Sequence, residues 1–332
     1  MVLTATRRRP SDDVAPALRH PARRTPGVAA EALRGRRTVN PREEWDGRMP
    51  EPTHILASLR LEQTGETRYR GPSVRSDIRP VVFGGQLMGQ MITAAATAQP
   101  GKTVRSIHVI FARAGTVKLP VDLDVDVMHA GRSLASVTVT ARQEQRLISR
   151  GMLLLDAGEP DLIRHGATLP EVGSPDMAVP LDWAEEGSEV RVVDGVDLAA
   201  TEVTGPPELS VWTRFTAAPD DIAVNQALLS WYTDPFLIGA SMRPHEGIGA
   251  GLAHQAISTG VLAHTLSFHE PVRATDWHLL AQRGTYAGGG RSYGRGEVFT
   301  QDGRLVASFV QDSMVRSFRD TQTARGSGIL TM

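Results

Sequence analysis

The residue whose type and surroundings most clearly suit it to catalysis is Asp234. It lies inside the apolar stretch NQALLSWYTDPFLIGASM at residues 225–242. Burying an unpaired carboxylate is costly, so this side chain must be paired, hydrogen bonded or used in chemistry. Asp234-Pro235 also has a simple structural interpretation, an N-cap followed by proline at the first helical position. A helix cap and a catalytic base are therefore both open for this carboxylate.

Other motifs have simpler structural interpretations than chemical ones. Gly84 and Gly85 precede a run of small and apolar residues, but their spacing differs from the G-x-G-x-x-G of a dinucleotide-binding turn. A central helix packed tightly against a sheet explains them better, because glycine allows close backbone approach. Asp122, Asp124 and Asp126 alternate with apolar residues, which is typical of a strand with one solvated face rather than a metal site.

Composition narrows the classes of function. The chain has 332 residues and a formal net charge of −1, which gives no general reason to expect a nucleic-acid partner. It has no cysteine, which excludes disulfides, thiolate catalysis and cysteine-ligated metals. The histidines lack metal-ligand spacing and the sequence has no G-x-S-x-G, so we expect neither a metal site nor a serine nucleophile elbow.

No apolar run approaches the roughly 20 residues of a membrane span, and no apolar signal core begins the chain. We expect a cytoplasmic protein that needs no cofactor.

Residues 1–50 differ from the rest of the chain. They carry eleven arginines, no lysine and six acidic residues, a formal charge of about +5. Proline and alanine are frequent and no apolar periodicity is sustained, which is typical of disorder. We expect a disordered N-terminal extension or a start of translation at Met49, and a short tail at residues 319–332. A nucleic-acid tail or a transit peptide is a weaker interpretation of the arginine clusters.

The remaining chain repeats one pattern, a helix followed by four strands at the spacing of an antiparallel meander. SIHVIFARAG at 106 matches HTLSFHEPVR at 264 in pattern, GRS recurs at 131 and 290, and QEQRLISRGML at 143 matches QDGRLVASFVQ at 301. The offset is 157 to 159 residues throughout. A fixed offset of this length indicates the duplication of one α+β unit.

The duplication predicts an α+β fold of two units, each with one helix laid across an antiparallel sheet. Edge strands of the two units could pair into one longer sheet, which would remove an exposed edge. We place the first unit at residues 51–157 and the second at residues 206–318. Residues 158–205, rich in Gly, Pro, Asp and Glu, are predicted to be a surface linker.

The chain resembles the acyl-CoA thioesterase II family, the double hotdog thioesterases. The matching pieces are VFGGQLMGQ at 82, SIHVIFARAG at 106, LLSWYTD at 228, AHTLSFHEPV at 263, RGEVFTQDGRLVAS at 295 and VQDSMVR at 310. They occur in the family's order and spacing over about residues 54–317. The resemblance implies a double hotdog fold, an acyl-CoA substrate and self-association into a homo-oligomer.

The family hydrolyses thioesters with a water that is held by an Asp on the second helix, a Thr or Ser on the next strand and a Gln on the last strand. By position, the resemblance assigns the Asp to Asp234 and the Gln to Gln311. The hydroxyl position falls on Val261, which cannot hydrogen bond a water, so Thr259 is the candidate substitute if a bulge alters the strand. Gly84, Gly85 and Val261 are expected to line the substrate site.

The first half lacks these groups. Its helix, GQLMGQMITAAATA, has no carboxylate, and Leu153 stands at the position that corresponds to Gln311. His108 is interpreted as a packed strand residue. We therefore expect the first half to be structural and the second to be catalytic.

Two alternatives remain open. One is an acyl-CoA-binding protein that has lost hydrolysis because of Val261. The other is a related hotdog enzyme such as a hydratase, for which we find no paired Asp and His motif.

Overall fold

The first half of the structure has a central helix followed by four strands. The computed structural model describes residues 54–74, 80–182 and 184–318, so the predicted N-terminal extension and C-terminal tail lie outside the described residues. A short helix and a hairpin come before the central helix α2. The elements of this half are α1 (His54–Ser58), β1 (Glu62–Gly65), β2 (Arg68–Gly71), α2 (Gly84–Ala98), β3 (Thr103–Phe111), β4 (Val121–Ala130), β5 (Leu134–Gln143) and β6 (Arg146–Asp156).

The second half repeats this order, with additional strands before its helices. Its regular elements are β7 (Val179–Pro180), β8 (Ser188–Val192), β9 (Glu208–Phe215), α3 (Ile222–Thr233), α4 (Leu237–Met242), β10 (Ile257–Phe268), β11 (His278–Gly288), β12 (Arg291–Thr300) and β13 (Leu305–Ser317). Single 3₁₀ turns occur at Pro175–Met177, Val193–Gly195 and Ala250–Leu252. The predicted duplication of a helix and four strands is confirmed.

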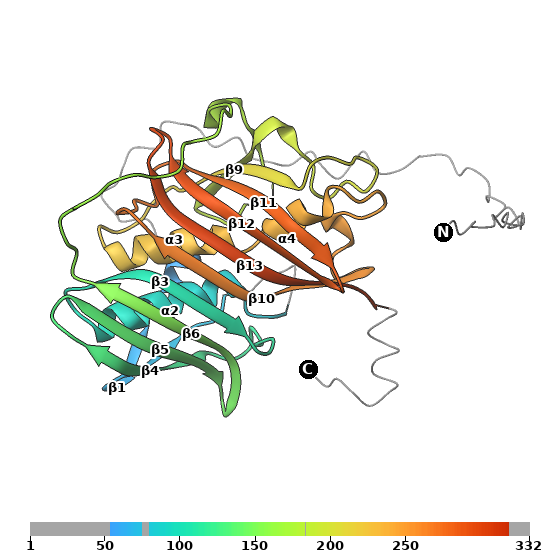
Figure 1. Cartoon of the computed structure of the whole chain (residues 1–332). Helices are drawn as coiled ribbons and strands as arrows, with labels where there is room; N and C mark the ends of the chain where they lie inside the picture. Colours follow the sequence, from blue (N-terminus) through green and yellow to red (C-terminus); the bar gives the residue numbers. More distant parts are fainter. Residues whose placement is uncertain (1–53, 75–79, 183, 319–332) are drawn as a thin grey trace, which may run out of the picture. The chain divides into compact units, whose positions relative to one another are not determined.

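One antiparallel sheet holds the strands of both halves, which meet at β3 and β10 (Figure 1). Its order is β1-β2-β4-β5-β6-β3-β10-β13-β12-β11-β9-β8-β7. At the junction, the pairs run from Ala263 opposite Ile110 to Ser267 opposite Ser106. Each half covers an edge strand of the other, which confirms the prediction of one longer sheet.

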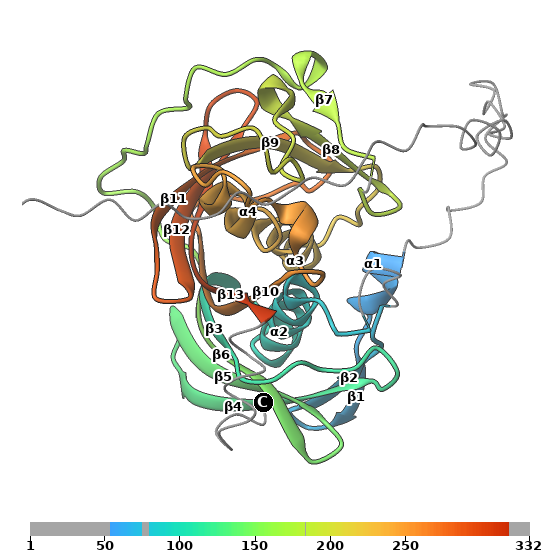
Figure 2. The ribbon, with the colours of Figure 1, turned by 90° about the vertical axis from the view of Figure 1, so that its right-hand side faces the viewer.

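The sheet curves around α2, α3 and α4, which lie on its concave side (Figure 2). This arrangement of helices wrapped by an antiparallel sheet, present twice, is the predicted double hotdog fold. Within the described residues, no helix combines the length and the apolar character that a membrane crossing requires.

Strand β4 shows how alternation fixes the faces of the sheet. In its first part Val121, Leu123 and Val125 are buried, whereas Asp122 and Asp124 point outward and are half-exposed. Arg70 Nε lies 2.6 Å from Asp122 Oδ1 and Arg68 Nε lies 3.4 Å from Asp124 Oδ1 across the β2–β4 pair. The prediction of a solvated acidic face is confirmed, because these carboxylates pair with arginines.

The glycines of α2 face helix α3. A Cβ placed on Gly85 would lie 2.8 Å from the carbonyl oxygen and 2.9 Å from the Cα of Trp231. Four residues further along α2, a Cβ on Gly89 would lie 3.3 Å from the carbonyl oxygen of Ala227. The sequence suggested close approach to the sheet, but these glycines let two helix backbones approach each other in an antiparallel arrangement.

Residues 158–205 are more ordered than a surface linker. Residues 158–168 are exposed, as expected. Further along, β8 pairs with β9 and extends the sheet, and Val190 and Val192 are buried. The alternation in SEVRV at residues 188–192 explains this strand, which surrounding acidic residues conceal in the sequence.

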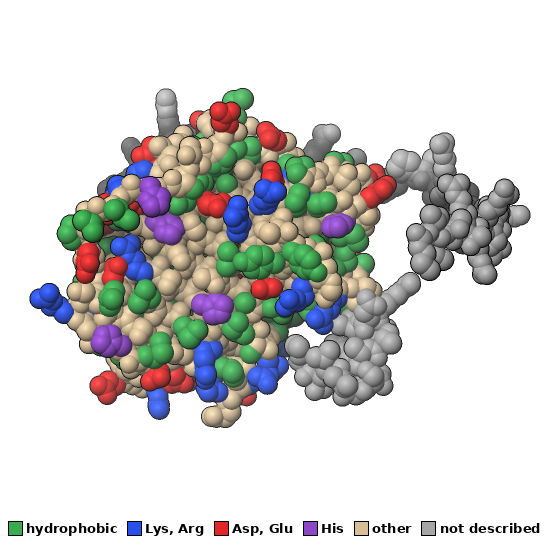
Figure 3. Space-filling model, viewed as in Figure 1, with side chains coloured by type: hydrophobic (Ala, Val, Ile, Leu, Met, Phe, Trp, Pro, Cys, Tyr) green, Lys and Arg blue, Asp and Glu red, His purple; other side chains and the backbone are tan. Residues whose placement is uncertain are grey.

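The outer face of the first-half strands carries exposed apolar side chains among charged ones. Figure 3 looks onto this side of the sheet, where both kinds are interspersed. The most exposed of these apolar side chains are Ile110, Met128, Leu134, Met152 and Leu154. Apolar residues scattered in this way are ordinary for a protein surface.

We predict that Gly85→Ala lowers the free energy of unfolding by about 1–3 kcal/mol, because its Cβ would overlap the backbone of Trp231, which cannot move aside cheaply. Gly89→Ala is the matched control in the same helix. Its closest contact is the flexible end of Leu59, 2.9 Å away, so the loss should be smaller and partly offset by the higher helix propensity of alanine. Urea unfolding of both variants checks this order, and equal losses would contradict it.

Candidate active site

Asp234 lies where the second-half helix breaks. The apolar stretch at residues 225–242 lies in two helices rather than one, α3 and α4, which are separated by Asp234, Pro235 and Phe236. Pro235 has no N–H to continue the helical ladder. The cap interpretation of Asp234 needs correction, because Phe236 is the N-cap of α4 and Asp234 is the C-cap of α3.

The carboxylate of Asp234 is buried against the beginning of α2, in the other half of the molecule. Asp234 is 4% exposed. A Cβ on Gly84, the first residue of α2, would lie 2.9 Å from its Oδ1 and 3.0 Å from its Oδ2. Only glycine leaves room for the carboxylate there. The first N–H groups of a helix and its dipole favour negative charge, so this is an electrostatically suitable place for a carboxylate.

Aromatic residues of both halves surround this point. The rings of Phe83, which precedes α2, and Trp231, in α3, have centroids 5.0 Å apart. Tyr232 stacks on Phe236 with centroids 6.3 Å apart. The structure thus brings together Asp234 and Gly84, and it assigns Gly85 to the helix–helix contact with Trp231.

Gln311 joins the last strand to the break between the helices. Its side chain is 1% exposed and its Nε2 donates a hydrogen bond of 2.9 Å to the backbone carbonyl oxygen of Asp234. The carbonyls at a helix C-terminus have no partner within the helix, so Gln311 satisfies one of them. On its other side, Oε1 of Gln311 accepts from the hydroxyl of Ser313 at 3.3 Å. The structure therefore places Gln311 beside Asp234, as the sequence analysis expected.

His264 completes the network from strand β10. Its Nδ1 lies 3.4 Å from Gln311 Nε2 and its Nε2 lies 3.2 Å from Thr233 Oγ1. Thr233 donates its own proton to the carbonyl of Ser230 at 2.9 Å, so its oxygen must accept from His264. His264 is therefore the neutral Nε2–H tautomer, stacked on Phe309 with ring centroids 5.6 Å apart.

A bulge in β10 determines which side chains face the site. The register with β13 shifts between Val261 and Ala263, so Val261, three residues before His264, is on the same inner face. Val261 lies directly opposite Ser313. A bulge is present, but it does not bring Thr259 to the site: it places Val261 rather than Thr259 nearest to Gln311.

Thr259 is further along the strand. It lies opposite Val315, four residues beyond Gln311 on β13 and thus about 13 Å along the strand. Its hydroxyl is 3.1 Å from Nε2 of His254. The structure does not bring this candidate hydroxyl to the Asp234–Gln311 pair.

Two residues of the network were missed by sequence reasoning. His264 was considered only as a metal ligand, and Ser313 was not considered. Alternation gives a signal for Ser313, because it is two residues after Gln311 and shares its face. No comparable local signal exists for His264, because its pairing with Gln311 depends on cross-strand register.

The first half has no equivalent network among the described residues. Leu153 is a buried apolar residue of β6. His108 bonds Thr265 across the junction, with Nδ1 and Oγ1 2.7 Å apart. This agrees with the interpretation of His108 as a packed strand residue.

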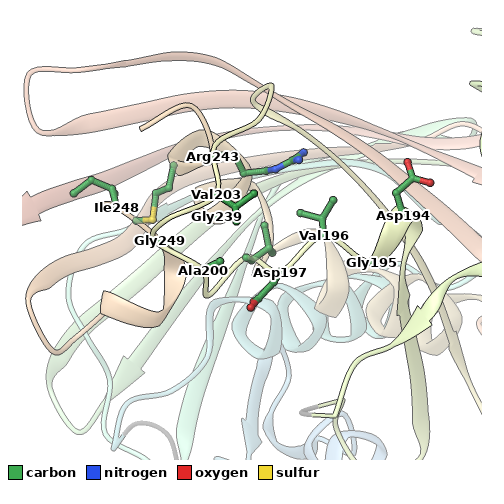
Figure 4. A pocket seen from close by; sticks show the side chains of 12 residues that line it. Asp194, Gly195, Val196, Asp197, Ala200, Val203, Gly239, Arg243, Ile248 and Gly249 are labelled. Atoms are coloured by element: carbon green, nitrogen blue, oxygen red, sulfur yellow. The ribbon is translucent and has the colours of Figure 1, made fainter. Parts of the chain in front are cut away.

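A cleft of about 310 Å³ lies between residues 194–203 and α4 (Figure 4). Gly239 and Met242 of α4, together with Arg243, contribute to its wall. None of the described residues that line this cleft belongs to the network of Asp234, Gln311, His264 and Ser313.

We predict that stability falls as the pH decreases below about 6.5. Burial lowers the pKa of His264 to about 3 and that of His278 to about 4, so below 6.5 the unfolded chain binds protons that the folded chain does not. His264→Gln should flatten the dependence of unfolding free energy on pH by at most about 1.4 kcal/mol per pH unit. The exposed His129→Gln is the control and should keep the wild-type slope. An unchanged slope in His264→Gln would contradict the neutral assignment.

Comparisons with known proteins agree with this architecture. The acyl-CoA thioesterase N-terminal domain matches residues 72–155 and the acyl-CoA thioesterase C-terminal domain matches residues 166–315. Acyl-CoA thioesterase 2 of Haemophilus influenzae is 28% identical over 79% of this chain and 97% of its own length. Acyl-coenzyme A thioesterase 8 of Mus musculus is 26% identical over 79% of this chain and 88% of its own length.

Solved structures give the same result. The acyl-CoA thioesterase II TesB2 of Mycobacterium marinum superposes with a TM-score of 0.67 at 27% identity, covering 79% of this chain and 98% of its own. The two domain models together match most of the described chain, in the order that the two halves require. The chain therefore belongs to the acyl-CoA thioesterase II family of double hotdog thioester hydrolases.

Proposed function

We propose that this protein hydrolyses acyl-CoA thioesters to a free fatty acid and CoA, with a water molecule that Asp234 activates directly. The observation that carries the proposal is the buried Asp234 carboxylate, held between the end of α3 and the beginning of α2. The names of the relatives support acyl-CoA as the substrate class.

The hydrogen bonds of Gln311 suggest how the water is held. Oε1 has two acceptor positions and Ser313 occupies one, which leaves one for a water proton. The second water proton would point to the Asp234 carboxylate. Both protons are then bound by acceptors, and the lone pair of the water oxygen is free to attack the thioester carbon.

The reaction balances with these groups alone. Asp234 takes a proton as the water oxygen bonds to the carbonyl carbon. The tetrahedral intermediate then expels the CoA sulfur, which receives that proton, and the carboxylate of Asp234 is restored. We assign the stabilisation of the oxyanion to the backbone N–H groups of Gly84 and Gly85, because the first N–H groups of α2 have no partner within the helix.

Val261 supports one alternative, because this apolar residue stands where the family has a hydroxyl. In that alternative the chain binds acyl-CoA and does not release CoA. This alternative would be favoured if calorimetry detects binding of acyl-CoA while a thiol-reagent assay detects no release of CoA.

Self-association and a cytoplasmic location remain predictions. Light scattering of the purified chain measures the first directly. A molar mass equal to that of the monomer would contradict the expected homo-oligomer.

We predict that Asp234→Asn lowers kcat for CoA release from medium- and long-chain acyl-CoA by about 10²–10⁴-fold, because the amide cannot accept the water proton. The melting temperature should stay close to that of wild type.

Asp312→Asn is the matched control, since it makes the same change one residue from Gln311 on the outer face of β13, where Asp312 meets Arg291. It should keep wild-type kcat. Wild-type activity in Asp234→Asn would overturn the assignment of the base.

A further inference from the structure

We infer that Ser313 is the positioning residue that holds the Gln311 amide in its working orientation, so that this chain supplies from β13 the hydroxyl that it lacks at residue 261. This inference rests on the proposed function, because it concerns the same water site.

The contacts of Gln311 fix which atom of its amide is the acceptor. Nε2 is 2.9 Å from the carbonyl oxygen of Asp234, and an amide rotated by half a turn would place two acceptors against each other. Oε1 therefore points to Ser313, whose hydroxyl is 3.3 Å away and must donate. The direction of this hydrogen bond follows from the contact on the opposite side of the amide.

Ser313 is buried in the interior of the site, beside Gln311. Its side chain is 2% exposed, and it lies two residues after Gln311 on the inner face of β13. Its direct neighbours across the sheet are Val261 on β10 and Ser292 on β12. The hydroxyl is thus buried between three strands, with Gln311 as its acceptor.

Because residue 261 is valine, the Ser313 hydroxyl has no competing acceptor at that position. Directly opposite side chains in an antiparallel pair have Cβ atoms about 4.5–5.5 Å apart, so residues 261 and 313 border the same space. Valine at 261 offers no acceptor that would compete for the proton of Ser313. The proton therefore goes to Gln311, and a hydroxyl on either strand can serve the same amide.

The hydrogen bond from Ser313 restricts the attacking water to a single position. Ser313 occupies one acceptor site of Oε1, and the attacking water takes the other. In Ser313→Ala both sites are open and the vacated space admits a second water, so the attacking water is divided between two positions. Binding of the acyl-CoA does not depend on the position of the attacking water. In Ser313→Ala, kcat should therefore change more than KM.

The test compares steady-state kinetics of Ser313→Ala, Ser313→Thr and the double variant Ser313→Ala/Val261→Thr with those of wild type. The substrate is the acyl-CoA that wild type hydrolyses fastest. Ser313→Ala should lower kcat about tenfold, the effect of one neutral hydrogen bond, with KM within about twofold. Ser313→Thr should stay close to wild type, and Val261→Thr should restore most of the lost kcat in the double variant.

Ser308→Ala is the matched control, because Ser308 is on the outer face of the same strand and bonds His269, with Oγ and Nε2 2.9 Å apart. It should leave kcat unchanged.

A wild-type kcat in Ser313→Ala overturns the inference, and so does a loss of kcat that follows the melting temperature and that neither threonine restores. Asp234→Asn, measured in parallel, separates the two claims. If it is inactive while Ser313→Ala is fully active, only the inference fails, and if it is fully active, the proposed function fails.

Discussion

The hydrogen bond from Gln311 Nε2 to the carbonyl of Asp234 joins the last strand of the sheet to the end of α3. The rest of the site depends on it, because it attaches the end of α3, where Pro235 interrupts the helix, to strand β13 and so fixes the position of Asp234 beside Gln311. The other half contributes the beginning of α2, where Gly84 leaves space for that carboxylate and Gly85 lets the two helix backbones approach. A charge that would be costly in an apolar core is placed at a helix N-terminus, which suits it. The duplicated fold therefore forms one site at the contact between its halves.

Most of the architecture could be predicted from the sequence. The repeat at a constant offset indicated two units, and the alternation in β4 assigned Asp122 and Asp124 to a solvated face that the structure confirms. The junction of β3 with β10 followed from the need to cover edge strands. Strand β8 was missed, because five residues of alternation in an acidic stretch are too short to stand out.

The candidate site was predictable only in part. Asp234 stood out as a carboxylate inside an apolar stretch, Gln311 was found because the resemblance identified its position, and the structure places the two residues in contact. The N-cap interpretation that was left open for Asp234 is wrong, because a local pattern does not show whether an Asp-Pro pair begins one helix or ends another. His264 and Ser313 depend on cross-strand register and on a bulge between Val261 and Ala263, and both are set by tertiary packing.

The most direct test of the account is a crystal structure of Asp234→Asn with a bound acyl-CoA. The account predicts a thioester carbonyl at the contact between α2 and α3, with its carbon about 3–3.5 Å from an ordered water. That water should be held by the amide that replaces the carboxylate at position 234 and by Oε1 of Gln311. The carbonyl oxygen of the thioester should face the N–H groups at Gly84 and Gly85. A thioester bound elsewhere, for example in the cleft between residues 194–203 and α4, would contradict it.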